Sequence, residues 1–146
     1  MVNTGIKMNN IGEYLKVFVI DVVEEEMGVV EMPNTLKDMK RITGAPCIEI
    51  GDIRIGENKF KSIYASKTNE NIHVSCADSK GKVIYRGNLI IVAYETNGNG
   101  DEILCSLTEE EIAVLLSNTD LMYLNNEKNN TEYNSYVLCN VTAEDR

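Results

Sequence analysis

The sequence predicts an α+β fold, a mostly antiparallel sheet of about 6–8 strands with two short helices. Short apolar, β-branched runs recur along the chain, and Gly, Asn and Asp residues separate them. Only two segments, about 35–43 and 108–118, carry apolar residues at helical spacing. Strands without regular intervening helices favour an antiparallel sheet over a βαβ arrangement.

The length of 146 residues is typical of a single domain. We expect one domain over 14–141, preceded by a flexible arm over 1–13 and followed by a frayed tail over 142–146. No internal repeat or domain boundary is visible. A hydrophobic content of 43% and a charged content of 25% are ordinary for a globular protein.

The first strands flank a charged turn. Residues 15–23 predict a central strand, and 28–32 its return in a hairpin that ends at Pro33, which cannot donate to a ladder. A strand over 47–55 is expected to break at Gly51-Asp52. Further strands are predicted over 60–66, 72–77, 82–86, 89–95, 102–105 and 136–141, with a polar, mobile loop over 125–134.

Capping residues mark both helices. Asn34 or Thr35 can cap the first helix, which Gly44 ends because glycine readily adopts the left-handed conformation. Thr108 and Glu111 have the spacing of a capping box at the start of the second helix. Three glutamates in that first turn also suit the helix dipole.

No apolar run approaches the roughly 20 residues of a membrane helix, and the polar N-terminus lacks a signal-peptide core. We therefore expect a cytoplasmic protein that does not bind membranes. Without C-x-x-C pairs, the four cysteines are expected to be buried thiols in strand-like segments: Cys47, Cys76, Cys105 and Cys139.

Charge is distributed unevenly. Residues 1–86 hold 12 acidic and 12 basic side chains, whereas 87–146 hold 11 acidic and two basic ones. Within the first part, 54–86 holds seven basic residues and three acidic ones. The chain therefore offers two candidate faces of opposite sign, which bears on its partners rather than its fold.

Catalysis has little support in the sequence. The single histidine, His73, lies in a strand-like segment without a recognisable nucleophile and orienting partner, so a weak hydrolase is the least favoured hypothesis. The Asn97–Asp101 loop lacks the spacing and distal glutamate of a calcium-binding loop. We expect no catalytic residues, metal or cofactor.

The acidic part suggests a protein-binding face. Carboxylates spread over a surface can imitate DNA phosphates and occupy the DNA channel of another protein, although a capped helix with a solvated face explains several of them equally well. The residues of this predicted face are Asp101, Glu102, Glu109, Glu110, Glu111 and Asp120.

The basic middle segment suggests an alternative. Lysine and arginine attract phosphate, and tyrosine can stack on a base, as in a small nucleotide pocket. Lysines on the solvent side of antiparallel strands are the simpler explanation. The predicted pocket residues are Lys59, Lys61, Tyr64, His73, Lys82, Tyr85 and Arg86.

Two stretches resemble a family of small uncharacterised domains from bacterial phages, plasmids and conjugative elements, often encoded near antirestriction genes. The first comprises VFVI (17–20), NTLKDM (34–39), ITG (42–44) and CIEI (47–50), and the second GNLIIV (87–92) and SLTEEEI (106–112). Together they cover about half the chain. The resemblance implies a mobile-element accessory protein and carries over no catalytic residues.

The sequence thus favours a non-enzymatic inhibitor of a host defence nuclease or complex, of the anti-CRISPR or antirestriction type, that binds through the acidic face. The alternative is a sponge that sequesters an anionic (cyclic) nucleotide immune signal in the basic pocket of a homo-oligomer. We expect no direct binding to duplex DNA.

Overall fold

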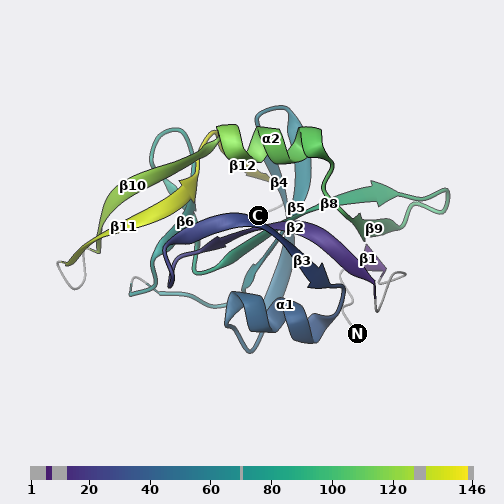
Figure 1. Ribbon diagram of the computed structural model, residues 1–146, viewed down its shortest axis with the longest axis horizontal. Helices are drawn as coiled ribbons and strands as arrows, with labels where there is room; N and C mark the ends of the chain where they lie inside the picture. Colours follow the sequence, from purple (N-terminus) through teal and green to yellow (C-terminus); the bar gives the residue numbers. More distant parts are fainter. Residues whose placement is uncertain (1–5, 8–12, 70, 127–130, 145–146) are drawn as a thin grey trace.

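Figure 1 shows the computed structural model, which describes residues 6–7, 13–69, 71–126 and 131–144. The α+β class is confirmed, with two helices and mostly antiparallel sheets. The elements are β1 (Ile6–Lys7), β2 (Tyr14–Asp21), β3 (Glu26–Pro33), α1 (Leu36–Thr43), β4 (Ile48–Ile55), β5 (Asn58–Ala65), β6 (Val74–Ala77), β7 (Val83–Arg86), β8 (Leu89–Thr96), β9 (Glu102–Cys105), α2 (Glu109–Ser117), β10 (Thr119–Asn126), β11 (Thr131–Leu138) and β12 (Val141–Glu144).

The strands form a large and a small sheet. The eight-stranded sheet runs β1-β9-β8-β5-β4-β12, with β2 joined to β8 and β3 joined to β2. The four-stranded sheet runs β10-β11-β6-β7. Strand β8 is central, because its first half pairs with both β2 and β5 and its second half pairs with β9. Among the described strands, only β1–β9 and β11–β6 pair in parallel.

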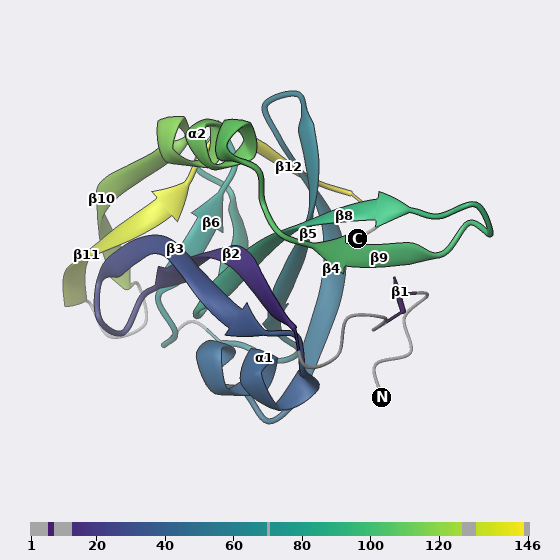
Figure 2. The ribbon, with the colours of Figure 1, turned by 45° about the vertical axis from the view of Figure 1, so that its right-hand side comes forward.

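Side-chain alternation along the large sheet creates two separate cores. On one face, Phe18, Phe60 and Ile91 pack in a cluster with Leu115 of α2 and Leu138 of the small sheet. On the opposite face, Val17, Ile63 and Ile90 pack with Met39 of α1. The two helices therefore lie on opposite sides of the large sheet, α1 below it and α2 above it in Figure 1, and Figure 2 shows the same separation.

Both helix starts follow the predicted capping chemistry. Thr35, rather than Asn34, caps α1 and accepts a hydrogen bond from the Asp38 N–H at 3.1 Å. Gly44 ends α1 with φ of 69°. Thr108 and Glu111 form the reciprocal capping box, with hydrogen bonds of 2.8 and 3.1 Å. Neither of the two helices in the described part of the chain is long and apolar enough to cross a membrane.

The twelve described strands exceed the number predicted. Strand β4 continues through Gly51-Asp52, because eight consecutive residues pair with β5. Much of the predicted loop 125–134 is strand, since β10 and β11 pair from Thr119 to Asn126 and from Thr131 to Leu138, with 127–130 outside the described residues. Polar side chains gave no apolar alternation there to indicate these strands.

The predicted ends also differ from the structure where it describes them. Within the predicted tail, Thr142–Glu144 belong to β12 and pair with β4. Within the predicted arm, Ile6–Lys7 pair with β9, and residues 1–5 and 8–12 lie outside the described residues. Backbone hydrogen bonds fix such short segments without any need for an apolar sequence pattern.

The cysteine prediction was only partly right. All four are free thiols, but only Cys76 is buried, Cys105 and Cys139 are half-buried, and Cys47 is exposed just before β4. His73 also lies outside a strand, because β6 begins at Val74. Cys47 and His73 each come just before a strand, so the alternation that buries every second strand side chain does not apply to them.

Candidate functional site

A cavity of about 350 Å³ lies where the β4–β5 hairpin of the large sheet meets β7 of the small sheet. The volume is near the lower end of the range for small-molecule sites, roughly 300–1,000 Å³. Three of the predicted pocket residues, Tyr64, Tyr85 and Arg86, line it. The remaining lining residues are Glu49, Ala65, Ser66, Thr68 and Ile84.

Two tyrosines form the aromatic part of this cavity. The ring centroids of Tyr64 and Tyr85 are 4.4 Å apart with an interplanar angle of 30°. The hydroxyls of Tyr85 and Ser62 share a buried hydrogen bond of 2.9 Å, which fixes the Tyr85 ring. Gly51 leaves room for Tyr64, because a Cβ at position 51 would lie 3.3 Å from the Tyr64 ring. The aromatic surface is thus held in place by its neighbours.

The charged groups of the cavity come from its two walls. Arg86, at the end of β7, is half-buried and donates from one Nη to the carbonyl oxygen of Ile72 at 2.9 Å. Its planar guanidinium has five N–H donors and suits phosphate or carboxylate. Glu49 on β4 is exposed and lies directly opposite Tyr64 in the strand register. Among the described residues, the lining therefore includes one cation and one carboxylate.

The other four predicted pocket residues lie elsewhere. Lys61 points to the α1 face of the large sheet, because it alternates with Ser62 along β5. Lys59 and Lys82 are exposed outside the cavity lining. The His73 ring stacks on Tyr133 of β11, with centroids 3.5 Å apart and an angle of 11°. Sequence proximity alone had grouped these residues with the three that meet.

Lys61 belongs to a buried ion-pair cluster. Only 3% of its surface is exposed, and its Nζ donates to carboxylates of Asp52 on β4 and Glu102 on β9, the latter at 2.8 Å. The same Nζ lies 4.6 Å from the centre of the Tyr94 ring. Burial lowers the pKa of Lys61, but the hydrogen bonds and charges of Asp52 and Glu102 outweigh burial and hold it above its ordinary value of 10.5.

The predicted acidic residues do not gather on one surface. Glu102 is engaged with Lys61, and the Glu111 carboxylate accepts from the Thr108 N–H. Asp101 is the last residue of the β8–β9 loop, whereas Asp120 lies in β10, which follows the C-terminal end of α2. Figure 1 shows that loop and β10 at opposite ends of the molecule. Glu109 and Glu110 are the two that remain exposed together, in the first turn of α2.

A smaller exposed surface on α2 combines charge with apolar area. Its residues recur at helical spacing on the side away from the core, and we call it the α2 face: Glu109, Glu110, Ala113, Leu116 and Ser117. Leu116 is 47% exposed. After α2, Leu121 and Tyr123 of β10 are also exposed, at 56% and 65%.

The thiols of Cys105 and Cys139 are not activated. Burial raises the pKa of Cys105, with the charges of Glu95 and Glu111 adding to it. Burial likewise raises the pKa of Cys139, helped by the charge and hydrogen bond of Asp120. A protonated thiol is a weak nucleophile. Within the described ranges, no three His, Cys, Asp or Glu side chains are placed to hold a metal ion.

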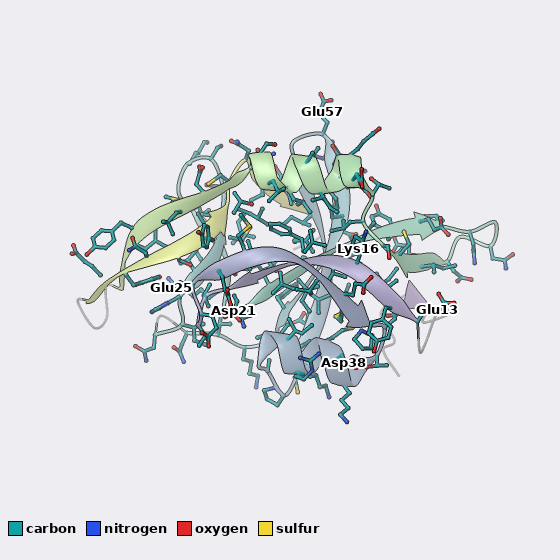
Figure 3. All side chains as sticks on the ribbon, in the orientation of Figure 1. Glu13, Lys16, Asp21, Glu25, Asp38 and Glu57 are labelled. Carbon is teal, nitrogen blue, oxygen red and sulfur yellow. The ribbon has the colours of Figure 1, made fainter. Side chains whose placement is uncertain are left out.

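A second hollow of about 500 Å³ lies between the β2–β3 hairpin and the C-terminal end of α1. It is more open and more apolar than the cavity at β7, and none of the predicted site residues lines it. Three carboxylates, of Asp21, Glu24 and Glu31, border it together with Arg41, whose guanidinium already bonds to Asp38 at 3.1 Å. Figure 3 labels Asp21 and Asp38 on this side of the molecule.

Sequence reasoning missed five of the lining residues: Glu49, Ala65, Ser66, Thr68 and Ile84. Alternation along β4 places Glu49 and Gly51 on the same face as Ile53, which is fully buried. A carboxylate and a glycine at inward positions of a strand are an available signal for a polar hollow, but the expected break at Gly51-Asp52 concealed the alternation.

No family model, curated protein or solved structure matches the chain.

Proposed function

We propose that this chain is a non-enzymatic binding protein whose cavity at Tyr64, Tyr85 and Arg86 takes a small anionic ligand with a planar ring, of the mononucleotide class. The observation that carries the proposal is the meeting of an arginine and a fixed tyrosine pair in one cavity. The guanidinium would bind a phosphate, and the ring system would pack against the half-buried Tyr64 and Ile84, with the buried Tyr85 ring supporting Tyr64 from within the core.

The size of the cavity bears on which nucleotide fits. A volume of about 350 Å³ is enough for one base with its sugar and phosphate. It is near the lower end of the range for small-molecule sites, which disfavours larger ligands. A linear or cyclic mononucleotide is therefore favoured over a dinucleotide enclosed by one chain. Combined with the resemblance to mobile-element domains, this supports a sponge that lowers the free concentration of a nucleotide immune signal in the host cytoplasm.

The first test is ligand-dependent stabilisation. Linear and cyclic mononucleotides at millimolar concentration should raise the melting temperature, because a ligand that binds only the folded state stabilises it. Arg86→Ala should weaken binding by about 10- to 100-fold, since a hydrogen bond to a charged group contributes roughly 1.5–3 kcal/mol. Titration calorimetry measures this directly.

Lys82→Ala is the matched control. Lys82 is an exposed cation on the same β6–β7 hairpin and lies outside the cavity lining. It should leave the affinity within about twofold of the unmodified chain, because an exposed charge contributes little at physiological salt. Equal losses in both variants, or no thermal shift with any mononucleotide, would contradict the proposal.

A second candidate function rests on the α2 face. Here the chain would inhibit a nucleic-acid-binding defence protein by stoichiometric binding, with Glu109 and Glu110 replacing DNA phosphates and Leu116 supplying apolar contact. Leu116 lies about two turns from these carboxylates on the same helix face, so a partner that binds this face would contact both charged and apolar surface. Asp101, Glu102 and Asp120 are not needed in this version.

Charge reversal tests the second candidate. Glu109→Lys with Glu110→Lys should abolish salt-sensitive capture of a nucleic-acid-binding partner from host lysate. The control is Glu13→Lys with Glu31→Lys, which makes the same charge change at exposed positions on β3 and just before β2, with Glu13 labelled in Figure 3. Capture that survives reversal on α2 would rule out this surface. The double variant on α2 leaves Thr108 and Glu111 unchanged, so it keeps the capping box.

A further inference from the structure

Glu49 is a carboxylate in a cavity proposed to bind an anion, and this sets a condition on the ligand. A ligand that was only negative would gain from Arg86 and be repelled by Glu49. A ligand that satisfies both walls must carry negative charge at the Arg86 end and N–H or O–H donors at the Glu49 end. The ligand is therefore polarised along its length.

The strand register fixes where those donors must lie. Glu49 lies directly opposite Tyr64 in the β4–β5 pair, so the two side chains leave the sheet next to each other. Side chains opposite each other in an antiparallel pair have Cβ atoms about 4.5–5.5 Å apart. A base that packs against Tyr64 would thus present one polar edge to Glu49, while its phosphate reaches Arg86 on β7.

We infer that Glu49 determines base specificity and selects a guanine-type mononucleotide, an inference that rests on the proposed function of this cavity. Guanine carries two adjacent donors, the ring N1–H and the exocyclic N2 amino group, which match the two oxygens of a carboxylate. Adenine presents on the same edge one donor, the N6 amino group, beside the bare N1 acceptor. Only one carboxylate oxygen can then accept a hydrogen bond, and the other faces the lone pair of N1.

The experiment compares three nucleotides on the intact chain by titration calorimetry: GMP, IMP and AMP. IMP keeps the N1–H and lacks the amino group, so it separates the two donors. GMP should bind about 10- to 100-fold more tightly than AMP, with IMP between them. In Glu49→Gln the ratio of GMP to AMP affinity should fall to about threefold or less, and AMP binding should strengthen because the repulsion of its phosphate is removed.

Glu57→Gln provides the matched control, because Glu57 is an exposed glutamate in the turn of the same β4–β5 hairpin, at the tip labelled in Figure 3. It should leave both affinities and their ratio unchanged. AMP binding as tightly as GMP, or a preference for GMP that survives in Glu49→Gln, would overturn the role of Glu49 and leave the proposed cavity function standing. Failure of GMP, IMP and AMP to bind at millimolar concentration would overturn the role of Glu49, and the absence of a thermal shift with any linear or cyclic mononucleotide would overturn the cavity function as well.

Discussion

Neutralising both carboxylates around Lys61 should destabilise the fold by about 3–5 kcal/mol, because it leaves a buried ammonium group unpaired. The double variant Asp52→Asn with Glu102→Gln keeps the size of both side chains and removes only their charge. Lys61 is almost fully buried, whereas the side chains of Asp52 and Glu102 are 27% and 34% exposed. The penalty therefore arises at the lysine, since each neutral amide remains partly solvated.

The pH dependence of this effect has a definite sign. In the unmodified chain the pKa of Lys61 is raised on folding, so its contribution is fully present below about pH 10.5 and is lost as the pH rises through the folded-state pKa. In the double variant, burial without the two carboxylates lowers that pKa. The folded state then binds fewer protons than the unfolded state, and stability rises with pH towards 10.5.

Urea unfolding between pH 6 and pH 10 measures this difference. The stability gap between the unmodified chain and the double variant should be largest at pH 6 and shrink towards pH 10. Each single variant retains one carboxylate and should lose less than half as much, because groups in one ion-pair network are not additive. The control is Glu95→Gln, because Glu95 is an exposed glutamate on β8, next to Tyr94 in the sequence. A gap that does not change with pH would refute the explanation.

Phe60→Ala should cost about 3–5 kcal/mol, the usual range for truncating a fully buried aromatic side chain. Phe60 has no exposed surface and packs in the cluster that joins β5 to α2 and the small sheet. The loss combines the transfer free energy of the ring with a cavity that the surrounding strands cannot fill. Against a typical total of 5–15 kcal/mol, it would populate the unfolded state measurably at moderate urea.

The adjacent residue supplies the comparison for Phe60. Lys59 precedes it on β5 and is exposed, so Lys59→Ala should change the unfolding free energy by no more than about 0.5 kcal/mol. Urea midpoints monitored by circular dichroism give both values. A cost below about 2 kcal/mol for Phe60→Ala would mean that the core around β5 collapses into the space far more readily than its packing implies.

The two candidate functions differ in what they require of the surface. Ligand binding depends on a cavity where the β4–β5 hairpin meets β7, and protein binding depends on the exposed face of α2. Leu115 of α2 and Tyr85 of β7 pack in the same core cluster. The α2 face and the cavity lining nevertheless have no residue in common. Arg86 and Glu109 variants therefore separate the two functions within one folded protein.

The sequence by itself determined the helix ends, the first hairpin and the fold class, because these depend on residues close together in the chain. Thr108 and Glu111 specify the start of α2, and Gly44 specifies the end of α1, because capping involves residues only three or four positions apart. The hairpin of β2 and β3 and the class of the fold follow from apolar runs and the turns between them. The aromatic and basic composition of 54–86 also pointed to three of the eight residues that line the cavity.

Only the tertiary structure decided which residues meet. Alternation along the predicted strand 60–66 already places Lys61 and Tyr64 on opposite faces, but only the tertiary structure shows that Lys61 meets Asp52 and Glu102 and that Tyr64 meets Tyr85. Glu49 joins the site through pairing with β5, and Arg86 through the packing of the small sheet against the large one. Composition cannot specify such contacts, because strand register and sheet packing set them between residues distant in sequence.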